Sequence, residues 1–252
     1  MIALKEFGHN IWLAEVESDS LDVRGALIVG DKRAVIWDTL SHPNDMKPYL
    51  PLIQNKELII VYSHADWDHI WGTAGLPYED RLVIGHSTSL MRFETDVPET
   101  LHKRKIAEPT QWDEVKLVKP NLTFQSELSM DLGSITLSLH MLAGHSPDCI
   151  VAFIPEHGIL LAGDTVETPF PAIYEDSPLD VWIAELDRWA HDPRLQTVIP
   201  AHGTIGGYEV IQSNANYLQD VRDGREIHIP DGLSDFYVET HKRNIKYGRC
   251  NP

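Results

Sequence analysis

The sequence predicts a mixed α/β fold, because strand patterns and helix patterns alternate along most of its 252 residues. The chain opens with three short apolar runs, at residues 11–16, 25–29 and 33–38, and the turn Gly30-Asp31-Lys32 joins the last two. Further on, single strands alternate with helices whose apolar residues recur at helical spacing. A β meander followed by an α/β arrangement is therefore expected.

The segment after the meander is predicted to contain two pairs of helices and strands. Residues 43–54 are expected to form a short helix despite two prolines, and the apolar run Leu58–Tyr62 is expected to form a buried strand. A strand at residues 82–84 and a helix at residues 87–93 follow. Between residues 94 and 121 the pattern weakens, so we expect an insertion that either lies over a site as a lid or has no function.

The second half of the chain is predicted to contain further strands and two amphipathic helices. The strands are expected at residues 122–128, 134–141, 150–154, 159–162 and 197–199. One helix is expected to begin after Ser177-Pro178 and the other after Gly207. Residues 227–252 are charged and weakly patterned, so the chain is divided into one domain over residues 1–226 and a tail of unknown role.

The composition predicts a soluble protein whose partner is not a polyanion. With 42% apolar residues and a formal net charge of -17, the chain can bury a core but repels nucleic acid and anionic membranes at long range. Its two cysteines, Cys149 and Cys250, imply no disulfide framework, which fits a reducing compartment. The first residues lack a signal-peptide pattern, and no apolar run approaches the roughly 20 residues of a membrane span. We therefore expect a cytoplasmic protein, and the sequence leaves its oligomeric state open.

Four ligand-type residues lie within six positions directly after the strand predicted at Leu58–Tyr62. They are His64, Asp66, Asp68 and His69. Buried charge is tolerated only where it is paired or bound to a metal, and imidazoles and carboxylates are metal ligands. The motif therefore predicts a divalent-cation site at the end of this strand.

Three further ligand-type residues follow other predicted strands. His145 lies in a Gly-His-Ser-Pro segment, Asp164 closes an apolar run that ends in Gly-Asp-Thr, and His202 lies in a Pro-Ala-His-Gly segment. If these strand ends lie along one edge of the sheets, seven ligands converge. Seven ligands suit two metal ions, each with room for water.

This ordered series of motifs, with Asp38 after the early strands, resembles the metallo-β-lactamase fold superfamily of metallohydrolases over roughly residues 10–225. The resemblance implies a four-layer αβ/βα sandwich, a hydrolase domain over residues 1–226 and a dinuclear site at one edge between the two sheets. It also assigns the ligands: the first metal ion to His64, Asp66 and His145, the second to Asp68, His69 and His202, and the bridging position to Asp164.

Asp66 departs from the pattern of that family, which most often has His-x-His-x-Asp-His with a histidine at this position. An aspartate is a harder, anionic ligand, so zinc is expected with manganese or iron as alternatives. Two divalent ions, three aspartates and a bridging hydroxide carry no net charge, whereas two aspartates would leave one positive charge. The site is therefore expected to attract anionic substrates less strongly than its relatives do.

Several residues near the motifs have structural interpretations that compete with functional ones. Tyr174 either polarises a substrate carbonyl or protonates a leaving group, or else it anchors its loop. Asp38 is expected to orient a ligand histidine rather than to bind metal. Cys149 is expected to be a buried thiol, while Trp67 and Trp71 either line a substrate pocket or pack in the core.

The leading functional hypothesis is hydrolysis by a hydroxide that bridges two metal ions, with Asp68 as both ligand and orienting group. Small-molecule esters, thioesters, lactones and phosphodiesters all suit such a site, and the charge sum favours the first three. A diiron redox protein that reduces dioxygen or nitric oxide with a separate electron donor is the alternative. A sensor without turnover is a third class, against which the complete ligand set argues.

Overall fold

In the computed structural model, which describes residues 2, 4–16 and 22–248, the chain divides into two units. The first unit contains the described residues up to Val16 and residues Val23–Ser138. The second unit contains Asp22 and the described residues from Leu139 onward. Cys250 lies outside the described residues.

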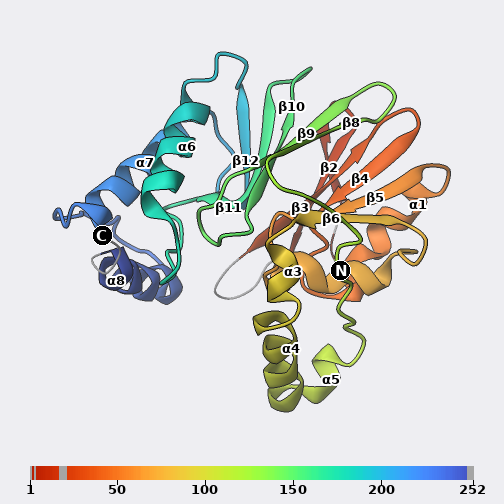
Figure 1. Cartoon of the computed structure of the whole chain (residues 1–252), viewed down its shortest axis with the longest axis horizontal. Coiled ribbons are helices and arrows are strands. Elements are labelled where there is room, and N and C mark those ends of the chain that lie inside the picture. The colour runs from red at the N-terminus through yellow and green to blue at the C-terminus, as the bar shows by residue number, and fades with distance from the viewer. Residues whose placement is uncertain (1, 3, 17–21, 249–252) are drawn as a thin grey trace. The chain divides into compact units, whose positions relative to one another are not determined.

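The first unit is built on a seven-stranded sheet in the order β1-β2-β3-β4-β5-β6-β7 (Figure 1). Its strands are β1 (Leu4–Gly8), β2 (Ile11–Val16), β3 (Val23–Val29), β4 (Arg33–Trp37), β5 (Glu57–Val61), β6 (Leu82–His86) and β7 (Leu122–Phe124). Strands β1 to β4 pair antiparallel, and strands β4 to β7 pair parallel. The predicted meander is confirmed, and β1 adds an edge strand that the sequence pattern did not predict.

The parallel strands bring two motif segments to one edge of this sheet. Strands β4 and β5 carry buried apolar runs, and their register pairs Trp37 with Val61. The Asp38 N–H donates to Val61 O at 2.9 Å, which continues this pairing by one residue. Because parallel strands end at the same edge, Asp38 and the segment that begins at His64 follow neighbouring strand ends.

The helices of the first unit are short, except for α4. They are the 3₁₀ helices η1 (Pro43–Tyr49) and η2 (Trp71–Gly75) and the α-helices α1 (Leu50–Ile53), α2 (Trp67–Ile70), α3 (Ser89–Arg92), α4 (Asp96–Ala107) and α5 (Pro109–Trp112). The helix predicted at residues 43–54 is divided between η1 and α1, because Pro48 lacks the N–H that a continuous α-helix needs. The segment predicted as an insertion, residues 94–121, contains α4 and α5, which extend away from the sheet in Figure 1.

The second sheet has five strands in the order β12-β11-β10-β9-β8. They are β8 (Glu127–Asp131), β9 (Thr136–Met141), β10 (Ile150–Ile154), β11 (Ile159–Glu167) and β12 (Thr197–His202). Strands β10 and β11 pair antiparallel, and β11 and β12 pair parallel. The single strand predicted at residues 122–128 is wrong, because the exposed bend at Gln125 and Ser126 separates β7 in the first sheet from β8 in the second.

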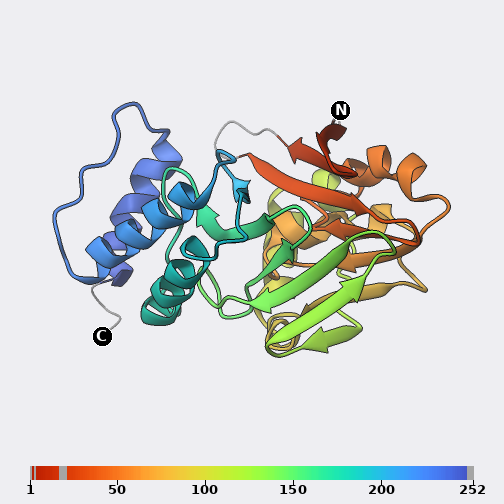
Figure 2. The ribbon, with the colours of Figure 1, turned by 90° about the horizontal axis from the view of Figure 1, so that it is seen from above.

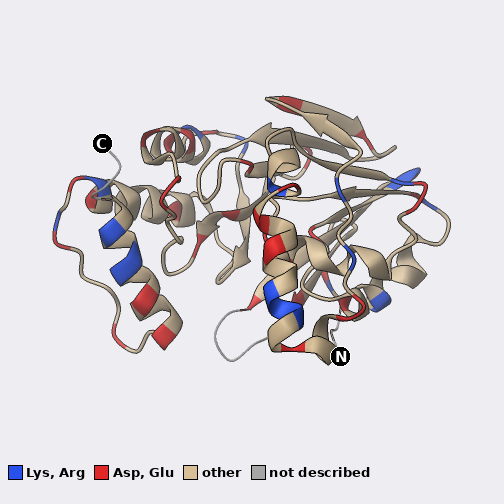
Figure 3. Cartoon of the chain, turned by 60° about the horizontal axis from the view of Figure 1, so that its bottom comes forward, with Lys and Arg blue, Asp and Glu red and all other residues tan. Residues whose placement is uncertain are grey.

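Within the described part of the second unit there are three helices, α6 (Leu179–Ala190), α7 (Tyr208–Arg222) and α8 (Asp235–Gly248). The predicted helices α6 and α7 lie side by side (Figure 2) and bury Trp182, Trp189 and Leu218. Helix α8 was not predicted, and Figure 3 shows acidic residues near its start and basic residues near its end, which suits the helix dipole. Among the helices that the structure describes, none has the length and apolar character needed to cross a bilayer. The mixed α/β fold class, with two sheets and helices, is confirmed.

Candidate metal centre

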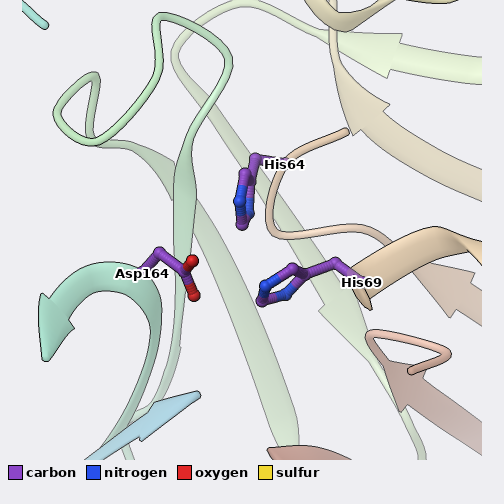
Figure 4. Close-up of side chains that lie close together, drawn as sticks. All are labelled: His64, His69 and Asp164. Carbon is purple, nitrogen blue, oxygen red and sulfur yellow. The ribbon is translucent and has the colours of Figure 1, made fainter. Parts of the chain in front are cut away.

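The opening motif lies in the turn between β5 and α2, in the first unit. His64 follows β5, Asp66 precedes α2 with an extended backbone, and Asp68 and His69 lie within α2. The side chains of His64, Asp68 and His69 are buried, and that of Asp66 is half-buried. The imidazole rings of His64 and His69 lie with their centroids 4.2 Å apart, and Figure 4 shows both rings. The first unit therefore brings four of the seven predicted ligands into one short segment.

Asp38 fixes the orientation of His69. Its fully buried carboxylate accepts hydrogen bonds from the Ser63 N–H at 2.7 Å, the Ser63 hydroxyl at 2.8 Å and His69 Nδ1 at 2.9 Å. Because a carboxylate only accepts, Nδ1 of His69 carries the ring proton and Nε2 carries the lone pair. This arrangement agrees with the orienting role predicted for Asp38.

The ring of His64 is oriented through Ser63. The Ser63 hydroxyl donates its proton to Asp38, so it accepts from His64 Nδ1, which lies 3.0 Å away. His64 therefore also carries its lone pair on Nε2. Ser63 was not predicted from the sequence, because a serine beside a histidine has no pattern that distinguishes it.

The second unit brings together the other three predicted ligands. Asp164 lies within β11, His202 ends β12, and His145 lies between β9 and β10; all three side chains are buried. His145 Nδ1 donates to Ala172 O at 3.1 Å, and His202 Nδ1 donates to Asp22 O at 2.5 Å. Since carbonyl oxygens only accept, both histidines carry the lone pair on Nε2.

Each of the four Nε2 atoms faces a carboxylate oxygen of its own unit at a separation that suits a shared cation. The distances are 3.6 Å for His64 to Asp66, 3.8 Å for His69 to Asp68, 3.7 Å for His145 to Asp164 and 3.3 Å for His202 to Asp164. Two ligand atoms that each lie about 2.1 Å from a tetrahedral zinc ion are about 3.4 Å apart. Two lone pairs at this separation repel unless a cation lies between them. The donor chemistry within each unit therefore fits a divalent ion.

Helix α8 holds the loop that orients His145. Asn244 of α8 donates from Nδ2 to Pro171 O at 2.8 Å, and its Oδ1 accepts from the Ile173 N–H at 2.8 Å. These two loop residues flank Ala172, whose carbonyl accepts from His145. The segment predicted to be a tail of unknown role thus supports one of the candidate ligands.

A buried carboxylate, Glu167, ends β11 beyond Asp164. Its Oε1 accepts from the Tyr237 hydroxyl of α8 at 2.8 Å, and its backbone bonds to the side chain of Asn214. Burial raises the pKa of Glu167 to about 6, and the neighbouring His202 opposes this rise. Glu167 therefore takes up a proton at a higher pH than an exposed glutamate does.

Tyr174 lies beside a candidate ligand of its own unit. Its ring meets the His145 ring edge-on, with the centroids 4.7 Å apart, and the Arg243 guanidinium lies 5.7 Å from its ring centre. The Tyr174 N–H donates to Ser177 Oγ, and the Ser177 hydroxyl donates to His145 O. Tyr174 is therefore anchored next to His145, and its catalytic role stays a prediction.

The tryptophans of the motif pack against the segment predicted as an insertion. Trp71 is fully buried and Trp67 is half-buried, and the ring of Trp112 lies 5.1 Å from Trp71 and 5.8 Å from Trp67 between centroids. The Arg104 guanidinium of α4 lies 4.7 Å from the centre of the Trp67 ring. The core-packing interpretation therefore holds for Trp71, and α4 and α5 contact the indole of Trp67.

Two other side chains with reactive groups have structural surroundings. Cys149 is buried as predicted, and burial raises the pKa of its thiol, which also accepts from the Ser146 N–H at 3.4 Å. A thiol with a raised pKa stays protonated at neutral pH and is a poor nucleophile. His86 bonds to Thr88 Oγ1 and Gln125 O, both at 2.7 Å, through its two ring nitrogens. Both nitrogens of His86 are thus bonded within the protein.

Comparison with known proteins identifies the family. The family model for the metallo-β-lactamase superfamily matches residues 25–202, and the chain therefore belongs to this superfamily. The metallo-β-lactamase type 2 of Bacteroides fragilis is 32% identical over 99 residues. This match covers 37% of this chain and 39% of that relative, so the chain matches less than half of the relative's length. A metallo-β-lactamase from Pontibacter korlensis superposes with a TM-score of 0.69 at 16% identity, covering 87% of this chain and 100% of its own. The mono-zinc form of the metallo-β-lactamase FIM-1 from Pseudomonas aeruginosa superposes with a TM-score of 0.66 at 18% identity, covering 87% and 95%.

These similarities establish the fold and the general class of the site. The chain has the fold of the metal-binding, hydrolase-type proteins of this superfamily, and its histidine and aspartate clusters are suited to metal. They give no support to the redox alternative, since the matched relatives described above are metallo-β-lactamases. At such low identities the structural matches show the fold alone, so the reaction has to be argued from the residues themselves.

Proposed function

We propose that the chain is a metal-dependent hydrolase that cleaves an ester, thioester, lactone or phosphodiester bond in a small molecule. One observation carries this proposal. All four candidate histidines donate from Nδ1 to a protein acceptor, and each places Nε2, which carries the lone pair, 3.3–3.8 Å from a carboxylate oxygen. Such contacts at Nδ1 fix the tautomer and raise the basicity of a metal-ligating histidine. His86, whose two nitrogens both bond to protein, shows the arrangement expected of a structural histidine.

In this proposal the seven predicted side chains hold two divalent ions. As the family pattern implies, one ion is assigned to His64, Asp66 and His145, and the other to Asp68, His69 and His202. Asp164 is assigned the bridging position. Zinc suits these imidazole and carboxylate donors, and the additional carboxylate of Asp66 makes manganese or iron acceptable.

The residues of the chain are assigned distinct parts of the reaction. Bound divalent ions lower the pKa of a shared water and stabilise negative charge on the attacked group. Asp68 accepts a hydrogen bond from the attacking water and orients it. Tyr174 donates a proton to the leaving group. Asp38 keeps His69 in the tautomer that presents Nε2.

Metal analysis combined with a substrate screen tests this proposal. The purified protein is stripped with a chelator and reloaded with zinc, manganese or iron(II), and both bound metal and turnover of the four substrate classes are measured. We expect two ions per chain and turnover of at least one class. Asp68→Asn, which keeps the side-chain volume, is expected to lower turnover at least 100-fold, since a positioned proton acceptor contributes about 10²–10⁴-fold.

A matched substitution separates this effect from a general loss of charge. Asp80→Asn removes a carboxylate from an exposed turn of the same unit and is expected to leave turnover and metal content unchanged. The hydrolase proposal is wrong if the chain binds no divalent ion, or if Asp68→Asn turns over every substrate as fast as Asp80→Asn does.

A further inference from the structure

Arg92, the last residue of α3, contacts the aspartate that distinguishes this motif. Its Nη2 lies 2.6 Å from Asp66 Oδ1 and 2.7 Å from Asp96 Oδ2, and its Nε lies 3.1 Å from Asp96 Oδ2. The other oxygen of the same carboxylate, Asp66 Oδ2, lies 3.6 Å from His64 Nε2. The two oxygens of Asp66 are therefore divided, one toward a guanidinium and one toward a candidate ligand histidine.

The contact between Arg92 and Asp66 is better shielded from solvent than the contact between Arg92 and Asp96. The side chains of Arg92 and Asp66 are 22% and 19% exposed, whereas that of Asp96 is 48% exposed. Solvent screens the charge of an exposed carboxylate more than that of a partly buried one. The charge of Arg92 therefore acts mainly on Asp66, while Asp96 anchors the guanidinium from the solvent side.

We propose that Arg92 is a positioning residue that makes Asp66 a ligand through one oxygen and cancels its charge. The pair of Asp66 and Arg92 then carries no net charge, as does the neutral histidine expected at this position from the family pattern. This inference rests on the proposed function, because it requires that Asp66 binds a metal ion.

The inference revises the charge expected of the site. Two divalent ions, a hydroxide and three aspartates sum to zero, but Arg92 adds one positive charge beside the first set of ligands. The half-exposed carboxylate of Asp96 offsets this charge only in part, because solvent screens it. A charge-assisted hydrogen bond also fixes the direction of the carboxylate, which would otherwise be able to bind an ion through both oxygens. The charge of the site therefore disfavours phosphodiester substrates, relative to uncharged esters, less than the motif alone indicates.

A double-mutant cycle of Asp66 and Arg92 tests the inference. Zinc affinity is measured by chelator competition for the unchanged chain, Arg92→Gln, Asp66→His and the double variant. In the Asp66→His background the guanidinium loses the carboxylate of Asp66 and keeps that of Asp96, so its remaining effect on the ion is repulsion. Adding Arg92→Gln is therefore expected to strengthen zinc binding. In the unchanged background Arg92→Gln also removes the bond that orients Asp66. We expect the two effects of Arg92→Gln on affinity to differ by at least tenfold.

Two further variants separate positioning from a general role in folding. Arg33→Gln removes an arginine whose ion pair with Glu57 lies at the start of β4, at the opposite end of that strand from Asp38, and is expected to leave zinc affinity unchanged. Arg92→Lys keeps the charge but loses the planar fork, so its zinc affinity is expected to lie between those of the unchanged chain and Arg92→Gln. Melting temperatures of the metal-free variants show which of them fold.

The outcomes distinguish this inference from the function on which it rests. Zinc binding by all variants, with the same effect of Arg92→Gln in both backgrounds, would overturn the role of Arg92 and leave the hydrolase proposal standing. Absence of zinc binding by the unchanged chain would overturn both. A tenfold or greater difference between the backgrounds, with Arg33→Gln unchanged, is the result that supports the pairing.

Discussion

Replacing Asp38 by asparagine tests whether one buried carboxylate holds His69 ready to bind metal. Asparagine has nearly the same shape and tolerates the left-handed backbone that Asp38 adopts, with φ of 58°, so the substitution adds little backbone strain. It removes the negative charge and replaces one acceptor oxygen by an NH₂ group. The experiment therefore isolates the hydrogen bonds that this side chain accepts.

The size of the effect follows from the three donors that surround Asp38. One oxygen accepts from the Ser63 N–H, and the other accepts from the Ser63 hydroxyl and from His69 Nδ1. Whichever way the asparagine amide turns, its NH₂ group faces one of the two N–H donors. A buried donor without an acceptor costs about 1–3 kcal/mol, and the lost charge assistance adds to this, so we expect about 2–4 kcal/mol of destabilisation. Loss of such a partner typically weakens metal binding about 10–100-fold.

Zinc competition against a chelator and denaturant unfolding of the metal-free protein measure the two effects separately. Asp45→Asn is the matched control, because Asp45 accepts from helix-capping backbone N–H groups, that of His42 at 2.9 Å among them, and burial raises the pKa of its carboxyl. We expect Asp45→Asn to keep the zinc affinity of the unchanged protein. If Asp38→Asn binds zinc within threefold of the unchanged protein, the claim that Asp38 sets the state of His69 is refuted.

Three further predictions concern the second unit. Tyr174→Phe keeps the ring but removes the hydroxyl, so turnover is expected to fall at least tenfold with unchanged zinc affinity; equal turnover would leave Tyr174 as a loop anchor. Asn244→Leu removes three hydrogen bonds of a buried amide and is expected to destabilise the protein by about 2–4 kcal/mol in denaturant unfolding. Burial lowers the pKa of His241, and the Tyr217 hydroxyl bonds to its Nδ1, so the folded state disfavours the protonated ring. The stability that depends on the neutral ring is therefore fully present above the ordinary imidazole pKa of about 6.5 and decreases as the pH falls below it. Amide exchange in α8, corrected for intrinsic rates, should be faster at pH 5.5 than at pH 7.5.

The ligand segments could be predicted from the sequence because each leaves a local signal. His64 and its neighbours follow a strand that is apolar and buried from Leu58 to Val61, and Asp164 lies on a strand that is buried along its whole length. The meander and helices α6 and α7 were equally visible, since alternation and helical spacing are properties of consecutive residues. These elements are fixed by patterns within a single segment.

The parts that could not be predicted depend on contacts between distant segments. The buried residues of helix α8, Thr240, Asn244 and Gly248, are small or polar, so they give no apolar signal of burial in the sequence. Arg92 meets Asp66 across 26 positions of the chain, and a single arginine in a short helix gives no sign of its partner. The bend between β7 and β8 sends neighbouring strands into different sheets without changing the polarity pattern.

The partners of the four histidines show most clearly what the sequence hides, and they lead to a last prediction. His69 depends on a side chain, Asp38, but His202 depends on the backbone carbonyl of Asp22, which any residue would supply. Replacing aspartate by asparagine should therefore lower zinc affinity at Asp38 but not at Asp22, although both residues contact candidate ligands. Asp22→Asn is expected to keep zinc affinity within threefold, while Asp38→Asn loses about tenfold or more. Chelator competition on the two variants side by side measures this contrast, and a comparable loss in both would mean that negative charge near the ligands, rather than the acceptor at Nδ1, determines the affinity.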